Sequence, residues 1–371
     1  MVQKIIIAGA GPAGCYLGSL LASSKADASI TILERSRSVL VKDSGMVSEH
    51  IFDFFQRASL AGIVGKEISS IALHSTKHTL ELERNEPFAF ILDRDKFGRK
   101  LRKTAEKNGC RLVYENIEDI TRTKGSVAVT TNKGQHVCDL IIGADGANSV
   151  VRKALVGSQP KLYQGILTNI KSGKRKPGID IFFNKEITRD FFAWRIFDEY
   201  GVLSSDKMAY HRFLEKYRFK PGRVAGSLVP IGLIKSYSDR CLLVGDAAAQ
   251  VKPVTGGGIV YSLTCAHIAA DVLKNAVVAK RYDAHTLSQY ENAWRKRIGN
   301  EVRLGLLFRK LYDNMSQAGV EHMFRTCGKD LENAMFSAKH FDYDKPSALA
   351  KNMFANKPAK LFLNGLLSLV L

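Results

Sequence analysis

Three glycine-rich segments hold the residues whose types and spacing could do chemistry. The first, Gly9–Gly14, places its glycines at a GxGxxG spacing. The second contains Asp145 in a Gly-Ala-Asp-Gly run, and the third places Asp246 ahead of three glycines, Gly256–Gly258. Backbone N–H groups that glycine leaves accessible bind phosphate, and a nearby carboxylate binds sugar hydroxyls. The pattern therefore indicates a nucleotide site.

The first segment needs a strand, a tight turn and a helix to direct its backbone toward a phosphate. Lys4–Ala8 is a β-branched apolar run, which predicts a buried parallel strand. Gly9 then allows the turn, Gly11 lets the backbone approach a pyrophosphate, and Gly14 permits close helix packing. We expect the helix from about Ala13 to Ser23, with its N-terminus favouring phosphate charge.

A second strand is predicted at Ser29–Leu33 and leads into Glu34, which follows Gly14 by 20 residues. An acidic residue at that place can hold a ribose diol. The alternative interpretation is a glycine-rich turn with a solvated glutamate. The strands, the helix and the acid together predict a dinucleotide site, but they do not distinguish NAD from FAD.

The later segments distinguish the two dinucleotides. Asp246 follows a predicted strand, Arg240–Val244, and precedes a helix start at Gly257, Gly258 and Ile259. A second set of free backbone N–H groups so far along the chain can face the middle of a long cofactor. Asp246 can bind a ribityl or ribose hydroxyl there, or it can be a helix cap. The three segments together predict non-covalently bound FAD.

In these segments the chain resembles a flavoprotein superfamily that contains aromatic hydroxylases, flavin halogenases and geranylgeranyl reductases, over roughly residues 1–310. An Asp-Arg pair, Asp93-Arg94, begins a predicted amphipathic helix, as in that superfamily. The resemblance implies that Arg94 approaches the cofactor. It implies further cofactor contacts from Ala13, Arg35, Ser44, Gly45 and Asp145.

Within the superfamily, the third segment is most similar to the geranylgeranyl reductases, including digeranylgeranylglycerophospholipid reductases. Hydroxylases usually carry His and Asn where this chain has Ala249 and Val260, and Tyr290–Gly299 resembles the helix that follows in the reductases. The resemblance implies FAD-dependent saturation of geranylgeranyl double bonds in a membrane lipid or its precursor. Reduced FAD would supply a hydride, and Ser44, Tyr261 or water would supply the proton, with no catalytic residue assigned.

Two departures from the reductases concern the predicted substrate region. Ser44 stands where they commonly carry a cysteine, and a hydroxyl differs from a thiol as nucleophile and proton donor. Phe192, Trp194 and Phe197 keep the tryptophan of a Tyr-x-Trp-x-Phe-Pro stretch but not its register. We expect these three side chains to line an apolar tunnel for an isoprenoid chain. Alternatively, they form the core of a sheet.

Other functions are open to a chain with these features. The alternative enzyme is an FAD-dependent monooxygenase of an aromatic or isoprenoid substrate. From another class, the chain could be a basic flavoprotein that binds RNA or a ligand without redox turnover. No second GxGxxG run occurs, so the reductant is expected to be external, either NAD(P)H or a reduced electron-carrier protein. No Cys/His set has metal-ligand spacing, so no metal is predicted.

The dispersed segments predict an α/β fold in which a Rossmann-like FAD-binding domain of the GR2 type carries an inserted β-sheet substrate domain and C-terminal helices. Residues 1–65, 93–152 and 240–310 are assigned to the FAD-binding domain. Residues 66–92 and 153–239 are assigned to the inserted sheet, and residues 311–371 to the C-terminal helical region.

A net charge of +19 predicts an anionic partner. Basic residues cluster at 171–176, 207–223 and 295–310, and an apolar stretch, 361–371, is too short to span a bilayer. These features favour peripheral contact with an anionic membrane over nucleic acid. The alternatives are a solvated basic surface and a terminal helix packed on the protein. The lack of C-x-x-C pairs and of a signal sequence predicts a cytoplasmic protein with reduced thiols.

Overall fold

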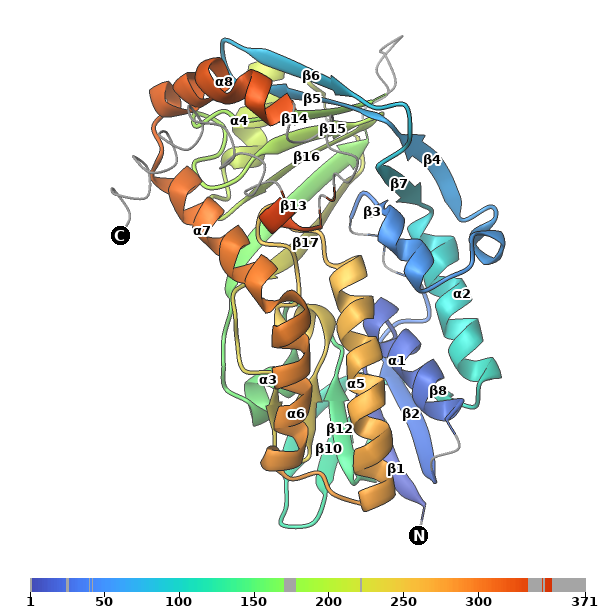
Figure 1. Ribbon diagram of the computed structural model, residues 1–371. Coiled ribbons are helices and arrows are strands. Elements are labelled where there is room, and N and C mark those ends of the chain that lie inside the picture. Colours follow the sequence, from blue (N-terminus) through green and yellow to red (C-terminus); the bar gives the residue numbers. More distant parts are fainter. Residues whose placement is uncertain are drawn as a thin grey trace.

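The chain folds around two large β-sheets, which lie in the lower and upper halves of Figure 1. A third, small sheet lies between them on one side. The computed structural model describes residues 2–24, 27–39, 41, 43–169, 178–220, 222–332, 342 and 344–348.

The lower sheet has the strand order β18-β19-β12-β1-β2-β8, and every neighbouring pair except β18–β19 is parallel. Its central strands are apolar runs because helices or strands cover both of its faces. The strands are β1 (Gln3–Ala8), β2 (Ala28–Glu34), β8 (Arg111–Tyr114), β12 (Leu140–Gly143), β18 (Tyr237–Ser238) and β19 (Cys241–Leu243).

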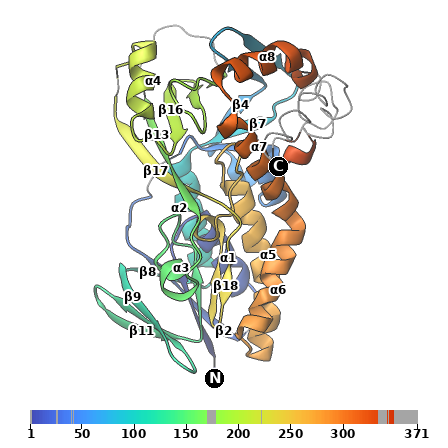
Figure 2. The same cartoon turned by 90° about the vertical axis from the view of Figure 1, so that its left-hand side faces the viewer.

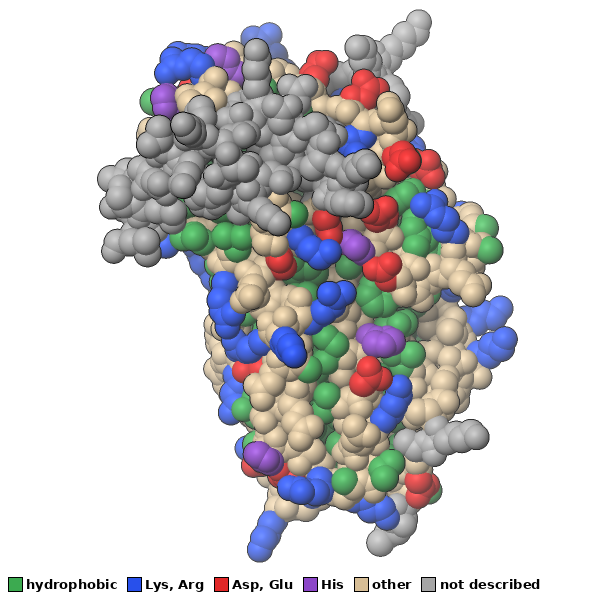
Figure 3. Space-filling view, in the orientation of Figure 1, with side chains coloured by type: hydrophobic (Ala, Val, Ile, Leu, Met, Phe, Trp, Pro, Cys, Tyr) green, Lys and Arg blue, Asp and Glu red, His purple; other side chains and the backbone are tan. Residues whose placement is uncertain are grey.

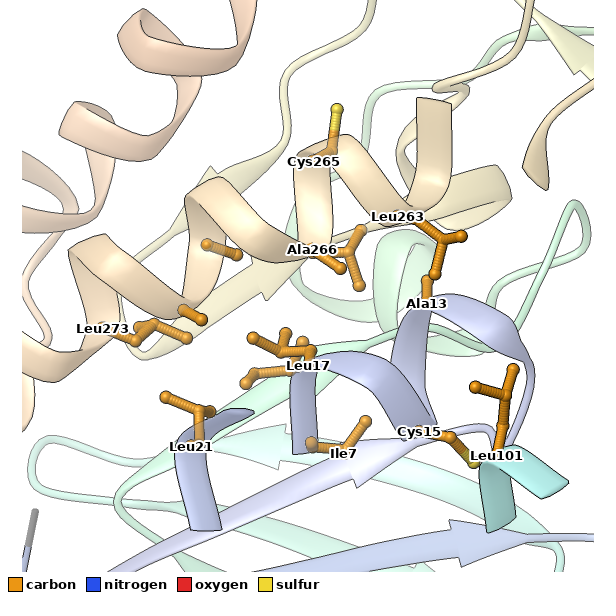
Figure 4. Packing of buried hydrophobic residues seen from close by; sticks show 14 of the residues in the cluster. Ile7, Ala13, Cys15, Leu17, Leu21, Leu101, Leu263, Cys265, Ala266 and Leu273 are labelled. Carbon is orange, nitrogen blue, oxygen red and sulfur yellow. The ribbon is translucent and has the colours of Figure 1, made fainter. Parts of the chain in front are cut away.

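Helices cover one face of the lower sheet, and a three-stranded antiparallel sheet with helix α3 covers the other (Figure 2). Side chains alternate along β1, so Ile7 belongs to the cluster on the helical side together with Leu17 (Figure 4), while Ile6 faces the other side. The elements are α1 (Pro12–Ala22), α2 (Arg94–Lys107), α5 (Ile259–Ala279) and α6 (Ala284–Trp294) on one face, and α3 (Val150–Leu155), β9 (Ile117–Arg122), β10 (Val127–Thr131) and β11 (Gly134–Cys138) on the other.

The upper sheet has the order β17-β13-β16-β15-β14-β5-β6 and is antiparallel except for the β14–β5 pair. Helix α4 packs on one part of it and α8 beside β6. These elements are β5 (Ser70–His74), β6 (Thr79–Glu83), β13 (Lys161–Asn169), β14 (Ile179–Phe182), β15 (Ala193–Ile196), β16 (Glu199–Ser204), α4 (Ala209–Tyr217), β17 (Val224–Ile231) and α8 (Gln317–Glu332).

The segments that join the two sheets include a small sheet of order β3-β7-β4 and helix α7. Helix α7 continues from α6 through a π-helical turn and reaches the upper sheet (Figure 1). The elements are β3 (Met46–Ser48), the 3-10 helix η1 (Glu49–Asp53), β4 (Val64–Ile68), β7 (Ala89–Leu92), the π-helical turn η4 (Arg295–Gly299) and α7 (Asn300–Asn314).

The predicted fold class is confirmed: a Rossmann-like β1–α1–β2 unit opens an α/β chain whose second sheet comes between segments of the first. Sheet membership differs from the expected segments at two places. β4 and β7 pair with β3 rather than joining the upper sheet, and β18 pairs with β19 in the lower sheet. Alternating apolar residues indicate a strand but do not identify its partner. The assignment of residues to domains stays our proposal.

Two regions of interest from the sequence, the basic cluster at 171–176 and the apolar stretch at 361–371, lie outside the described residues. Within the described part of the chain, no helix has both the length and the apolar character that crossing a bilayer requires. On the face shown in Figure 3, Lys and Arg side chains are interspersed with Asp and Glu rather than gathered in one patch.

Candidate active site

A cavity of about 1380 Å³ lies between the lower and upper sheets. Its walls come from the β1–α1 turn, the start of α5, the upper sheet and α7. Most residues that the sequence predicts as cofactor contacts line it: Gly9, Gly11, Ala13, Glu34, Arg35, Ser44, Arg94, Asp145, Asp246, Gly257, Gly258 and Ile259. Segments far apart in the chain therefore meet at one space.

The β1–α1 turn brings bare backbone to the cavity wall. Gly9 has φ +101°, and a Cβ there would overlap the carbonyl oxygen of Ala144. Gly14 does not line the cavity, because it packs directly against the Gly9 carbonyl and secures the turn. Around Gly11, the N-cap of α1, a Cβ would meet nothing within 4 Å, and no side chain caps the helix. The helix N-terminus is thus available to an anion.

Glu34 is held in place at the carboxyl end of β2. Its Oε2 accepts a hydrogen bond from Ala10 N–H at 2.9 Å and lies 3.6 Å from Nη2 of Arg102. Arg102 is 8% exposed, and its Nη1 donates to the carbonyl oxygens of Ser36 and Arg37 at 3.0 and 2.8 Å. The sequence analysis did not identify this buried arginine. A signal was present, because Arg102 follows Leu101 directly and so lies at the edge of the apolar stripe of α2.

Asp145 carries an unpartnered acceptor into the cavity wall. Its Oδ2 accepts hydrogen bonds from the N–H groups of Val150 and Val151, at 2.7 and 3.2 Å. Its Oδ1 is buried and has no hydrogen-bond partner among the described residues. Burial raises the pKa of this carboxyl. Because buried polar atoms are almost always paired in native proteins, a bound hydroxyl or N–H donor is the expected partner of Oδ1.

Asp246 lies at the other glycine-rich turn, beside the start of α5. Among the described residues none donates a hydrogen bond to its carboxylate, and burial raises its pKa to about 6. A Cβ on Gly258 would lie 2.9 Å from Asp246 Oδ1, so glycine lets the carboxylate approach the helix start. Val244 and Gly258 occupy the N-cap positions of the adjacent helices, which excludes the alternative that Asp246 is a cap.

The loop that contains Ser44 is fixed by Arg94. Arg94 Nε donates to Asp43 Oδ1 at 2.8 Å, and the same oxygen accepts from Gly45 N–H at 2.9 Å. Gly45 has φ +72° and packs against the Leu92 carbonyl, so it supports the loop without lining the cavity. The Ser44 side chain is presented to the cavity from this loop. Arg94 therefore positions Ser44, the residue that stands where the reductases commonly carry a cysteine.

The described groups suit a long dinucleotide. Two uncapped helix N-termini, those of α1 and α5, offer free N–H groups to phosphate. Asp145 and Asp246 offer unpartnered carboxylate oxygens to hydroxyl or N–H groups. Arg35 is exposed at the rim. The residues present thus fit FAD.

The apolar end of the cavity is lined by Phe192 and Trp194, whose rings meet edge to face with centroids 6.3 Å apart. The Trp194 ring lies against Gly201 on the neighbouring strand, where any Cβ would overlap it. Phe197 does not line the cavity. It has φ +55°, its ring centroid lies 3.8 Å from Lys66 Nζ, and it packs against a hydrophobic cluster that also includes Trp194. Phe197 lies where the chain reverses after β15. The spacing of the aromatic residues along the sequence did not reveal this turn.

Two further side chains differ from the sequence expectations. Tyr261, a suggested proton donor, does not line the cavity, and its hydroxyl donates to the carbonyl oxygen of Asp344 at 2.6 Å. Glu199, which the sequence did not mark, accepts a hydrogen bond from Trp194 Nε1 at 3.4 Å, and burial raises its pKa to about 7. Tyr261 is therefore removed from the candidate donors, and Glu199 helps to orient Trp194.

A group of side chains with metal-ligand chemistry occurs among the described residues, where His50, Asp342 and Asp344 approach one another. His50 Nε2 lies 2.9 Å from Asp342 Oδ2, and Asp344 pairs with the buried ammonium of Lys252 and with Ser48. The carboxylates are thus held by protein cations, and the group is an ion-pair network.

The described cysteine side chains are all free and buried, as the prediction of reduced core thiols required: Cys15, Cys110, Cys138, Cys241 and Cys265. Burial raises the pKa of four of these thiols to about 12 and that of Cys265 well above its usual value. None of these five cysteines lines the cavity. Among the described residues, therefore, no other thiol takes the place of the cysteine that the reductases commonly carry at the position of Ser44.

Comparisons with known proteins agree with this geometry. A family model described as "FAD binding domain" matches residues 2–171. A digeranylgeranylglycerophospholipid reductase 2 from Methanothermobacter thermautotrophicus is 28% identical over 356 residues, covering 86% of this chain and 91% of the relative. A geranylgeranyl bacteriochlorophyll reductase-like protein from Thermoplasma acidophilum superposes with a TM-score of 0.81 at 17% identity, covering 98% and 99% of the two chains.

The fold is shared more widely than this reductase group. A flavin-dependent brominase, Bmp2, superposes with a TM-score of 0.70 at 14% identity, covering 99% of this chain and 98% of that one. The matched domain supports FAD as the cofactor. The matched domain and the reductase relatives show that the chain is an FAD-dependent oxidoreductase, and it is similar to the geranylgeranyl reductases.

Proposed function

We propose that this protein saturates isoprenoid double bonds in a membrane lipid or its precursor. The observation that carries the proposal is the continuity of one cavity, which joins the glycine-rich turns to an aromatic chamber. The names of the reductase relatives support the same substrate class. A cavity of about 1380 Å³ has room for part of an isoprenoid chain beside a cofactor.

When bound and reduced, FAD supplies a hydride to one carbon of an alkene. The residues of this chain would bind and orient the reactants. The N-termini of α1 and α5 would hold phosphate, and Asp145 and Asp246 would hold hydroxyl groups of the cofactor. Phe192 and Trp194 would orient the alkene and exclude water. The Ser44 hydroxyl, or a water molecule beside it, would deliver the proton.

The substrate proposal is tested by anaerobic incubation of the holoprotein with dithionite and a digeranylgeranylglycerophospholipid in detergent. We expect the lipid to gain two hydrogens for each double bond reduced, as measured by mass spectrometry. A saturated lipid of the same headgroup is the control and should keep its mass. An unchanged unsaturated lipid under dithionite, with oxygen incorporation once air is admitted, would instead establish the monooxygenase alternative.

The physiological reductant is proposed to come from outside the chain. It is either NAD(P)H, bound transiently, or a reduced electron-carrier protein. Stopped-flow absorbance after mixing the oxidised holoprotein with NADH, NADPH or a reduced ferredoxin separates these reductants. Bleaching of the flavin by a nicotinamide at saturable rates would identify the first, and bleaching only by the carrier protein would identify the second.

A further inference from the structure

Helix α7 contributes a buried arginine to the wall of the same cavity. Arg309 is 7% exposed and lines the cavity together with Tyr312, one turn further along the helix. Its guanidinium carbon lies 3.6 Å from the ring centroid of Phe191 and 4.4 Å from that of Tyr163. These two rings are inclined at 73° to each other, so they enclose the guanidinium from two directions and restrict its position.

The polar atoms of this pair are incompletely satisfied. Arg309 Nη2 is buried without a hydrogen-bond partner among the described residues, and the same is true of the Tyr312 hydroxyl. The carboxylate of Asp313 is 3.9 Å from Arg309 Nη2, which is beyond hydrogen-bonding distance. Two unpaired buried donors at one cavity wall point to an acceptor that binds there.

Nearby charges favour an anionic acceptor. Lys185 Nζ lies 3.5 Å from the Tyr312 ring centroid, and burial lowers the Lys185 pKa to about 8, although the carboxylates of Asp313 and Asp190 act in the opposite direction. Burial raises the pKa of Asp313, the carboxylate nearest to Arg309 Nη2, which weakens it as a counter-ion. No carboxylate among the described residues lies within hydrogen-bonding distance of Arg309 Nη2, so this donor is available to an anionic acceptor.

The other acid in this region is already committed to hydroxyl groups. Asp190 Oδ1 accepts from Thr188 at 3.2 Å and from Ser204 at 2.7 Å, while Oδ2 accepts from Ser205 N–H at 2.9 Å. Asp190 therefore leaves the guanidinium of Arg309 free for an incoming ligand.

The apolar chamber is continuous with Arg309. The Phe191 ring, which lies beside the guanidinium, contacts Phe192 with centroids 5.4 Å apart, and Phe192 contacts Trp194. A ligand that reaches Arg309 and fills this chamber must therefore have an apolar chain with an acceptor at one end.

We propose that Arg309 and Tyr312 bind the phosphate of an amphiphilic substrate whose isoprenoid chain lies along Phe191, Phe192 and Trp194. The guanidinium would donate two parallel hydrogen bonds to phosphate oxygens, and the Tyr312 hydroxyl would donate a third. The inference rests on the proposed reductase function and assigns the residues that would hold the phosphate of its lipid substrate.

Binding is tested on the oxidised holoprotein, without turnover, by titrating two saturated isoprenoid glycerol ethers and following flavin fluorescence. One ether carries a terminal phosphate and the other ends in a hydroxyl. We expect Arg309→Met to weaken the phosphate ligand by about 30-fold or more and the hydroxyl ligand by less than about 3-fold. Tyr312→Phe should weaken only the phosphate ligand, by about 5-fold.

Matched variants and a free anion complete the test. Arg303→Met removes an exposed arginine from the same helix and should bind both ligands as the wild type does. Arg309→Lys keeps the charge without the planar fork and should recover only part of the phosphate affinity. Thermal unfolding without ligand checks that the variants are folded.

Inorganic phosphate should compete only weakly with the phosphate ligand. Binding of inorganic phosphate as tight as that of the lipid would overturn the lipid-headgroup assignment in favour of a free anion.

The outcomes separate this inference from the proposed function. Equal phosphate-ligand affinity in the wild type and in folded Arg309→Met would overturn the inference even if the wild type reduces the lipid. Arg309-dependent phosphate binding without any lipid reduction would support the phosphate site and reject the reductase reaction.

Discussion

At the scale of the residue, the candidate active site keeps polar groups that folding alone does not satisfy. Asp145 Oδ1 is buried without a partner among the described residues, and Asp246 is held beside the start of α5 with a raised pKa. Such groups cost stability until a ligand pairs with them. The protein is therefore expected to be less stable without FAD. Residues that are selected for function often lower the stability of the fold in this way.

The Asp246 carboxyl allows a test of this cost. Burial raises its pKa from 3.8 to about 6, so its ionised form opposes folding above pH 6, and the cost disappears below pH 3.8. Asp246→Asn should therefore raise the free energy of unfolding of the apoprotein at pH 7 by about 1–2 kcal/mol, as measured by urea denaturation. The same variant should weaken FAD binding about tenfold or more, as measured by flavin fluorescence.

Asp119→Asn, at an exposed position on β9, is the matched control and should change neither quantity. A destabilised Asp246→Asn apoprotein, or one that binds FAD with wild-type affinity, would contradict the role assigned to this carboxylate.

The packing of Trp194 on Gly201 permits a second test at the residue scale. Gly201→Ala would place a methyl group where the indole ring lies and would displace the ring within the chamber. We expect kcat/KM for lipid reduction to fall by about tenfold to a hundredfold while FAD affinity stays unchanged, because only the chamber wall moves.

Gly125→Ala is the control for that variant, because a Cβ at this turn would contact nothing within 4 Å. Unchanged kinetics of a folded Gly201→Ala protein would show that the position of Trp194 does not matter to the substrate. Loss of FAD binding would show that the chamber and the cofactor site are not separable.

At the scale of the element, the segment of residues 342 and 344–348 links three parts of the cofactor region. Asp342 pairs with His50 on η1, Asp344 pairs with Lys252 in the third glycine-rich segment, and the Asp344 carbonyl accepts from Tyr261 on α5. The Lys252 and Asp344 side chains are 7% and 4% exposed, so the pair is buried and depends on this segment being docked.

The docking of this segment should depend on pH through His50. Its hydrogen bond to Asp342 raises the His50 pKa from 6.5 to about 9, although burial acts in the opposite direction. The contribution to stability is fully present below pH 6.5 and is lost as the pH rises through 9. Relative to His50→Gln, the wild type should lose about 1–2 kcal/mol of unfolding free energy across this range, as measured by urea denaturation of the apoprotein.

His285→Gln is the control, since His285 is exposed and should give a curve parallel to that of the wild type. Parallel curves for the wild type and His50→Gln would mean that the His50–Asp342 pair does not stabilise the fold.

At the scale of the whole molecule, strong local patterns made much of the fold predictable. The spacing of Gly9, Gly11 and Gly14 and the apolar run before them identified the β1–α1–β2 unit. The sequence could not reveal contacts set by distant strands. Arg102 lies under the loop after β2, and Arg309 lies on the cavity wall, but neither side chain belongs to a local motif.

The same limit explains the two errors at the site. Phe197 and Trp194 are separated by two residues, yet the positive φ of Phe197 turns its ring away from the cavity. Tyr261 follows the third glycine-rich segment closely, but it faces Asp344, which is distant in sequence. Side-chain direction at a turn or a helix start depends on tertiary packing, which spacing does not encode.

The net charge of +19 is the basis of a prediction for the whole surface. We propose peripheral attachment of a cytoplasmic protein to anionic membranes. In flotation assays, the fraction bound to vesicles that contain phosphatidylglycerol should exceed that bound to phosphatidylcholine vesicles and should fall as salt is raised. Equal binding to both vesicles would contradict an electrostatic contact, and salt-sensitive RNA binding without vesicle binding would favour the nucleic-acid alternative.

The most direct test of the central claim is an anaerobic single turnover. The holoprotein's flavin is photoreduced, a digeranylgeranylglycerophospholipid is added in detergent, and flavin absorbance is followed together with lipid mass. The account predicts flavin reoxidation with one double bond lost per flavin oxidised, and no reoxidation by the saturated lipid. A flavin that stays reduced with the unsaturated lipid until oxygen enters would contradict the proposed function.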